Sequence, residues 1–319
     1  MLTPRENLIR YLKNEPFEWN PSSEDMVSFM PELIPDNVCR GFVMQQQPFT
    51  GSYGGTDLLG CQWEFEPLVG GSMEIGTLMD DIEDWEEKVV FPDLSAFDWE
   101  GTAQANKEML TTDKLIRTTI FTGYFERLIA FIGFENSAMA LVDEDQQEIV
   151  HKIFGKLTDL YIEMIRRFHD HFGVELVEVH DDWGTQRSPM FSLDTLEEMI
   201  ATYVRRLVDF AHSIGVFVEI HSCGQIEALI PGLIDTGADM WRGQAINDKW
   251  MLVEKYGDRF HFGVEIRPDA PVDDATAAAL TEEALTKWAG KNVWFAIGRP
   301  FSPAQRAAMS QAIRDHGKI

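Results

Sequence analysis

The stretch GVELVEVHDDWG, residues 173–184, carries polar side chains at alternate positions near its carboxyl end. Glu178, His180 and Asp182 occupy every second position. Successive side chains of a β-strand point to opposite faces, so these three groups share one face. Buried parallel strands are normally apolar on both faces. The stretch therefore predicts a strand that ends in a polar, chemically useful face.

Two later stretches repeat this pattern. Residues 216–223 read VFVEIHSC and residues 260–267 read FHFGVEIR. The polar side chains at their alternate positions are Glu219, His221 and Cys223, then His261, Glu265 and Arg267. If the pattern occurred on one strand only, two explanations would be equally good: a structural network of hydrogen-bonded polar groups inside a barrel, and a functional site. On three strands that carry His, Cys, Asp and Glu, function is the better explanation.

From about residue 110 the chain alternates between short β-rich runs and amphipathic helical runs. The expected strands are 115–121, 176–180, 216–221, 240–246, 260–266 and 293–297. The expected helices are 143–169, 193–213, 225–236, 250–256, 282–289 and 303–315. This order predicts βαβ units and a parallel sheet. A doubly wound open sheet is the alternative, but polar faces on several strands favour a closed barrel, whose active sites lie at the carboxyl ends of the strands.

Length and order together predict an α/β protein with a (β/α)8 TIM barrel and an N-terminal extension. The chain has 319 residues, and such a barrel typically takes about 250. We expect residues 1–319 to form one domain, in which residues 1–110 hold the embellishment and the first strands and residues 111–319 hold the regular βα units.

Composition excludes several classes of protein. There are 53 acidic and 27 basic residues, so the formal net charge is −26, which disfavours nucleic acid and favours a partner with a basic face. Three cysteines make a disulfide framework unlikely to be the basis of the fold and fit a reducing compartment. We find no signal-peptide core and no apolar run near the ~18 residues of a membrane span, and we expect a cytoplasmic protein that does not bind a membrane.

The segment His221-Ser222-Cys223 is a candidate metal site. An imidazole and a thiolate two positions apart at a strand end suit zinc. Glu265 is the preferred third ligand, and the alternatives are Glu219, Gln244 and His180. A lone buried cysteine that acts only as a small apolar side chain is the simpler explanation of Cys223.

Several of these motifs resemble the uroporphyrinogen decarboxylase-like superfamily. They are residues 173–184, residues 221–226 (HSCGQI), residues 229–231, residues 235–239 (DTGAD), residues 122–126 (TGYFE) and residues 298–300. The similarity covers essentially the whole chain and is clearest over residues 110–303. It implies a (β/α)8 barrel, in agreement with the pattern of strands and helices.

Differences from the decarboxylase pattern indicate which branch of the superfamily the chain resembles more. The chain lacks the arginine-rich N-terminal segment that holds the carboxylates of the tetrapyrrole, and residues 1–60 offer only Arg5, Arg10, Lys13 and Arg40. Residues 221–226 are similar to the corrinoid-dependent methyltransferase branch, and residues 55–63, 84–85 and 91–94 look like its O-demethylase members. No cysteine follows Cys223, which departs from the members that transfer methyl groups to thiols.

The resemblance implies a methyltransferase that moves a methyl group from a methoxylated aromatic, or a similar O- or N-methyl donor, to the cobalt of a corrinoid protein. Zinc would be held by His221, Cys223 and Glu265, and Asp182, His180 and Tyr124 are the candidate catalytic groups. The candidate substrate-binding residues are Trp183, Trp63, Phe121 and Gln244. For any one of the aromatic residues, core packing is the simpler explanation.

The expected partners are a small-molecule methyl donor and a separate corrinoid protein, and the resemblance leaves a homodimer open. Two other functions remain as alternatives. One is decarboxylation of a tetrapyrrole, as in uroporphyrinogen decarboxylase. The other is a non-catalytic barrel that binds a tetrapyrrole or a corrinoid protein.

Overall fold

A computed structural model describes residues 2–68, 70–298 and 300–317 of the chain. Its main sheet has seven parallel strands in the order β1-β5-β6-β7-β8-β9-β10 over this part of the chain. These strands are β1 (Met26–Ser28), β5 (Leu115–Ile120), β6 (Leu176–His180), β7 (Phe217–Ser222), β8 (Met240–Gly243), β9 (His261–Ile266) and β10 (Val293–Ile297). The parallel sheet expected from the order of strands and helices is confirmed.

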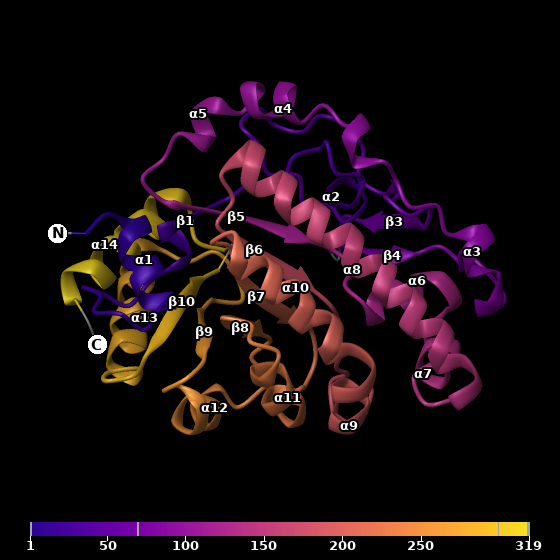
Figure 1. Ribbon diagram of the computed structural model, residues 1–319. Helices are drawn as coiled ribbons and strands as arrows, with labels where there is room; N and C mark the ends of the chain where they lie inside the picture. The colour runs from indigo at the N-terminus through magenta and orange to yellow at the C-terminus, as the bar shows by residue number, and fades with distance from the viewer. Residues whose placement is uncertain (1, 69, 299, 318–319) are drawn as a thin grey trace.

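The two edges of this sheet meet, so the sheet curls into a TIM-barrel-like fold (Figure 1). Ser22, just before β1, forms a parallel bridge with Phe295 of β10. The Phe295 N–H donates to the Pro21 carbonyl at 2.8 Å. The expected barrel fold is thus confirmed. Over the described residues its main sheet has seven strands where eight were expected, and the segment just before β1 contacts β10.

Helices follow most strands and cover the outside of the sheet (Figure 1). They are α6 (Phe125–Ile132), α7 (Phe134–Ala140), α8 (Glu144–Phe172), α9 (Leu193–Thr195), the π-helical η4 (Leu196–Ile200), α10 (Ala201–Ser213), η5 (Glu227–Leu229), α11 (Ile230–Asp235), α12 (Lys249–Tyr256), α13 (Asp274–Lys287) and α14 (Pro303–His316). The expected helix at 282–289 begins eight residues earlier, because the Asp273 carboxylate caps the N–H of Thr276. Among the described residues, no helix is both long and apolar enough to cross a membrane.

The strands sort their side chains between two cores. Val177, Val179, Ile220 and Phe262 belong to the large core under the helices. A smaller core fills the amino end of the barrel lumen with Leu115, Leu176, Met240 and Trp294 of the strands, against α1 (Pro4–Leu12). Helix α1 therefore closes the lumen from below, and the polar side chains that alternate with the valines point inward, as the sequence predicts.

Residues 31–110, here called the N-terminal layer, lie beside the barrel (indigo and purple in Figure 1). They contain an antiparallel sheet of β2 (Gly55–Thr56), β3 (Gln62–Glu66) and β4 (Gly71–Glu74). The helical elements around it are α2 (Pro35–Cys39), η2 (Ile82–Asp84), α3 (Trp85–Lys88), η3 (Leu94–Ala96), α4 (Trp99–Ala105) and α5 (Lys107–Leu110), and η1 (Ser23–Asp25) precedes the layer. Buried Arg127 of α6 pairs with Asp36 at 2.6 Å and with Asp57, which fastens the layer to the barrel.

Candidate metal centre

Two arginines and two glutamates form a charged floor in the middle of the lumen. Arg117 of β5 lies 2.7 Å from the Glu178 carboxylate and 3.2 Å from that of Glu219. Arg242 of β8 contacts the same two carboxylates from the other side. Burial opposes ionisation of Glu178, but Arg242 and Arg117 hold its pKa well below the usual range. These four groups balance one another, which is the condition for keeping charges inside a fold.

Above this floor, His180, His221 and Cys223 bring three potential ligand atoms within 4.8 Å of one another. His180 and His221 are register partners on the adjacent strands β6 and β7. Their rings stack at 4.8 Å between centroids, and the Cys223 sulfur lies 3.8 Å from Nε2 of His221. Parallel register therefore assembles the group from two neighbouring strand ends.

A buried carboxylate fixes the tautomer of His180. Nδ1 of His180 lies 3.1 Å from the Glu126 carboxylate, whose other oxygen accepts from Arg40 at 2.6 Å. Burial opposes the charge of Glu126, but Arg40 and His180 lower its pKa to about 2. An ionised carboxylate only accepts hydrogen bonds, so Nδ1 carries a proton and Nε2 is left to face the centre. Burial opposes a positive charge on His180, but Glu126 raises its pKa to about 10, so a metal bound at Nε2 would displace a proton from that nitrogen.

The loop after β5 places Glu126 beside Nδ1 of His180. Thr122 has a positive φ of 62°, and a Cβ on Gly123 would come within 2.6 Å of the Asp181 side chain. The Asp181 carboxylate accepts the N–H groups of Tyr124, Phe125 and Glu126 at 2.8, 3.1 and 2.8 Å. Burial raises the pKa of Asp181 to about 6. The start of α6 is thus held against the strand that carries His180.

Hydrogen bonds between neighbouring loops hold Cys223 in place. The Asp182 carboxylate accepts the Cys223 N–H at 3.0 Å, and Gln244 accepts the Gly224 N–H at 2.9 Å. Gly224 has a φ of 77°, and a Cβ there would lie 2.1 Å from the Gly184 backbone. The loops after β6, β7 and β8 are consequently bonded to one another and together hold Cys223 in place.

The structure brings most of the predicted polar residues to this place. His180, His221 and Cys223 form the group, and Asp182 lies 4.0 Å from Nε2 of His180. The Phe121 ring lies 5.8 Å from the His180 ring. Glu265, the preferred third ligand, is exposed on β9 and is not part of the group, in which His180 takes the third position. Arg299 of the 298–300 motif lies outside the described residues.

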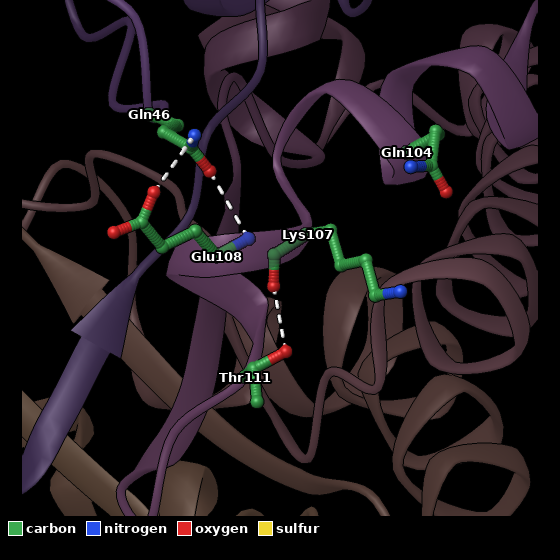
Figure 2. A pocket seen from close by; sticks show the side chains of 5 residues that line it. All are labelled: Gln46, Gln104, Lys107, Glu108 and Thr111. Carbon is green, nitrogen blue, oxygen red and sulfur yellow. Dashed lines mark hydrogen bonds between the residues drawn. The ribbon is translucent and has the colours of Figure 1, made fainter.

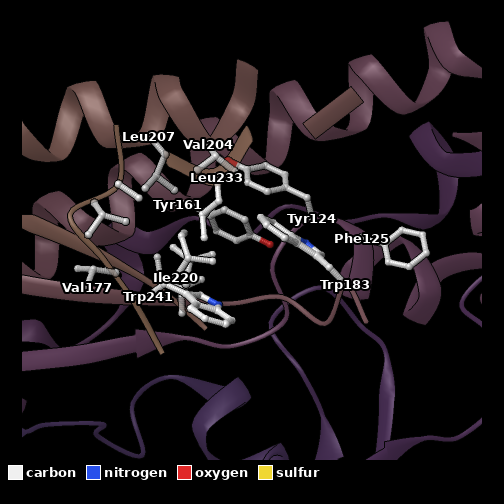
Figure 3. Packing of buried hydrophobic residues seen from close by; sticks show 14 of the residues in the cluster. Tyr124, Phe125, Tyr161, Val177, Trp183, Val204, Leu207, Ile220, Leu233 and Trp241 are labelled. Carbon is white, nitrogen blue, oxygen red and sulfur yellow. The ribbon is translucent and has the colours of Figure 1, made fainter. Parts of the chain in front are cut away.

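Three of the predicted aromatic residues occupy packing positions. The Tyr124 hydroxyl lies 3.1 Å from the Thr158 hydroxyl of α8, and Figure 3 shows its ring among core side chains. Burial raises the pKa of Tyr124 far above the usual range, as expected of a hydroxyl inside an apolar core. Trp63 donates to Asp57 at 2.8 Å within the N-terminal layer, and Trp183 is buried against Phe191. Core packing, the simpler explanation, therefore describes their positions.

Glu126 and Arg40 are parts of this site that the sequence patterns did not predict. Both are charged yet buried, at 6% and 8% exposure. The signal for Glu126 was present, because it ends the 122–126 motif directly after a predicted strand. Arg40 comes from the N-terminal layer, and only the three-dimensional contact reveals its role.

The residues fit zinc. Imidazole and thiolate are both ligands that zinc binds, and a catalytic zinc site with three protein ligands leaves a fourth position for water or substrate. Among the described residues, the buried Nδ1 of His221 has no hydrogen-bond partner, and burial followed by the charge of His180 lowers the pKa of His221 well below the usual range. A neutral imidazole is the form that binds a metal.

A surface pocket elsewhere has no comparable chemistry. Gln46, Gln104, Lys107, Glu108 and Thr111 line it on the N-terminal layer. Figure 2 shows Gln46 bonded to the backbone and the carboxylate of Glu108, at 3.1 and 3.4 Å. These bonds tie the segment around Gln46 to α5, so the pocket has a structural explanation.

Two comparisons concern the sequence. Residues 127–251 match the family model for uroporphyrinogen decarboxylase (URO-D). A uroporphyrinogen decarboxylase of Myxococcus xanthus (strain DK1622) is 31% identical over 96 residues, which are 30% of this chain and 26% of that protein. The match thus spans about a quarter of the length of the curated relative.

One comparison concerns the fold. A methyltransferase from Methanosarcina mazei superposes with a TM-score of 0.69 over 99% of both chains, at 16% identity. At that identity the likeness shows a shared fold. The family model thus supports the resemblance to uroporphyrinogen decarboxylase over residues 127–251, which include His180, His221 and Cys223, and the structural comparison shows a fold shared along the whole chain.

Proposed function

We propose that the protein is a methyltransferase that takes a methyl group from a methoxylated aromatic, or a similar O- or N-methyl donor, and passes it to the cobalt of a separate corrinoid protein. One observation carries the proposal: His180, His221 and Cys223 gather at the carboxyl ends of the strands, next to the partly exposed carboxylate of Asp182. That end of a barrel is where enzymes of this architecture work.

The chain's own residues divide the work. His180, His221 and Cys223 would hold zinc, which when bound acts as a Lewis acid on the oxygen of the donor. Glu126 keeps the His180 ring in place through Nδ1, and Arg40 keeps Glu126 ionised. Phe121 offers an apolar surface beside His180.

Asp182 is the proposed proton-handling group. Its side chain is 30% exposed and lies 4.0 Å from Nε2 of His180, so a bound donor can reach it. In methyl transfer, the nucleophile forms a bond to the methyl carbon, the carbon–oxygen bond breaks, and its electron pair stays on the oxygen. That oxygen then takes a proton that comes from solvent, and the Asp182 carboxylate can take up this proton and pass it on.

The decisive assay mixes the purified protein, a reduced corrinoid protein and a panel of methoxyarenes, and follows the absorbance of methylated cobalamin. We expect methylation with the wild-type protein and a large loss in Asp182→Asn. The family match makes decarboxylation the competing outcome. Turnover of uroporphyrinogen without any methylation would establish the decarboxylase instead.

Elemental analysis tests the metal separately. We expect about one zinc per chain in the wild-type protein and far less in Cys223→Ala. Cys61→Ala is the matched control, because Cys61 is a buried thiol in the N-terminal layer, outside the metal group. A zinc content that Cys223→Ala leaves unchanged would argue against this centre.

A further inference from the structure

Lys249, the first residue of α12, buries a cation that the centre described above leaves unused. Its Nζ is shielded from solvent and has no hydrogen-bond acceptor among the described residues. It lies 3.5 Å from the centroid of the Trp241 ring. Contact with an aromatic face offsets only part of what an ammonium loses on leaving water.

The nearby carboxylates do not neutralise Lys249. Glu219 is already paired with Arg117 and Arg242, and in the described part of the chain Nζ of Lys249 forms no hydrogen bond with Glu265. Burial lowers the pKa of Lys249 to about 7, and Glu265 only partly opposes the shift. Within the described residues, the amino group of Lys249 thus lies in the interior without a partner anion, and an anion bound beside it would favour its charged form.

The position of Lys249 connects it to the candidate metal centre. It follows β8, on the side of the barrel where Cys223 follows β7. Asn247, two residues before it, donates to the Gly224 carbonyl at 2.9 Å and accepts the Ile226 N–H at 2.8 Å. Burial, His180 and Arg242 lower the pKa of His221, and Lys249 adds a smaller contribution.

We propose that Lys249 binds a carboxylate carried by the substrate, so that the methyl donor of the proposed function is an aromatic carboxylate. That the bound molecule is a methyl donor rests on the proposed function. That Lys249 binds a carboxylate does not. One ammonium with three donors suits a single carboxylate, whereas a phosphate normally recruits several cations or an arginine fork. Binding the anion would supply the acceptor that Nζ lacks.

The test measures binding to the zinc-loaded protein without any corrinoid partner. Isothermal titration compares 4-methoxybenzoate with uncharged 4-methoxybenzyl alcohol, on the wild type and on Lys249→Met. We expect the variant to bind the benzoate about ten- to hundredfold more weakly, the range for a hydrogen bond to a charged group, and to bind the alcohol unchanged. Lys249→Arg should retain part of the preference for the anion.

Lys255→Met is the matched control, because Lys255 lies on the same helix, 4.9 Å over the Tyr256 ring, but is exposed. It should bind both probes as the wild type does. Equal losses for both probes in Lys249→Met, no loss at all, or no binding of either probe to the wild type would overturn the proposal. A preserved preference for the benzoate together with no methyl transfer would overturn the proposed function and leave the carboxylate site standing.

Discussion

The contact between Glu126 and His180 decides, at the scale of single residues, how the centre would hold a metal. A histidine ligand needs one ring nitrogen free and the other fixed, and a carboxylate on the second nitrogen does both. Here the carboxylate is itself fixed by Arg40 at 2.6 Å. The ring orientation of His180 is thus determined by side chains outside the ligand group.

Replacing Glu126 by Gln should weaken zinc binding without removing a ligand. The amide can still accept from Nδ1, but it lacks the charge that strengthens the bond and leaves Arg40 without its counter-ion. We expect zinc affinity to fall about ten- to hundredfold, the usual effect of losing such a partner. Competition with a chromophoric chelator measures it.

Glu163→Gln is the control for that experiment. Glu163 is a partly exposed carboxylate of α8 that pairs with Arg166 and Arg167, and its loss should leave zinc affinity unchanged. If both variants bind zinc as tightly as the wild type, Glu126 does not position His180 for a metal.

The sequence predicts which face of a strand a residue occupies more reliably than which residues on that face come within contact distance. Alternation correctly placed His180 and His221 on the inner face, and parallel register then made them partners. Glu265 follows the same alternation on β9, but its register partner is Ala296 of β10. Beyond Trp241 and Phe262, β8 and β9 are no longer paired in the described residues. Carried across β8, the register puts Glu265 level with Cys223, but β9 lies two strands from β7, and this sideways distance leaves Glu265 outside the group.

Helix α1 shows how an added element can make stability depend on pH. It closes the lumen below β9, where the His261 ring packs 4.2 Å from the Tyr11 ring and its Nε2 lies 3.3 Å from the Leu12 carbonyl. Burial lowers the pKa of His261 to about 4, opposed by the Leu12 carbonyl and Asp239. The folded protein therefore prefers the neutral imidazole, whereas the unfolded chain binds a proton near its ordinary pKa of 6.5.

The free energy of unfolding should consequently fall as the pH drops from about 6.5 to about 4. Above 6.5 both states hold a neutral His261, and below 4 both are protonated, so the whole effect lies in between. A shift of this size corresponds to roughly 3 kcal/mol. Urea unfolding at pH 7 and at pH 4.5, compared between the wild type and His261→Gln, measures the share of this residue. An equal pH dependence in both proteins would contradict the assignment.

Element boundaries were predictable where the apolar period and the capping signal agreed. The expected strands 176–180 and 293–297 coincide with β6 and β10. The alanine-rich first half of α13 has little apolar contrast, so periodicity located only its second half. The turn before α6 depends on the positive φ of Thr122, which no residue type announces. Glu126 was for that reason not recognised as a neighbour of His180.

On the scale of the whole molecule, the N-terminal layer and the barrel share one site. Arg40 belongs to the layer, whereas its partners Thr122 and Glu126 belong to the barrel, at 3.1 and 2.6 Å. A second contact between the layer and the barrel is the buried ion pair of Arg127 with Asp36 and Asp57. Loss of the layer should therefore disturb His180 even though none of its residues belongs to the metal group.

Arg127→Met tests this coupling. The change leaves the carboxylates of Asp36 and Asp57 buried without their cation, and breaking a buried ion pair on one side costs about 3–5 kcal/mol. We expect a loss of that size in urea unfolding, together with weaker zinc binding because Arg40 is displaced.

Arg166→Met is the control, since Arg166 forms an exposed pair with Glu163 and such pairs contribute about 0–1 kcal/mol. The triple variant Arg127→Met, Asp36→Asn and Asp57→Asn should recover part of the stability, because neutral amides lose less on burial than unpaired carboxylates. If Arg127→Met loses stability but binds zinc normally, the layer supports the fold without holding the site.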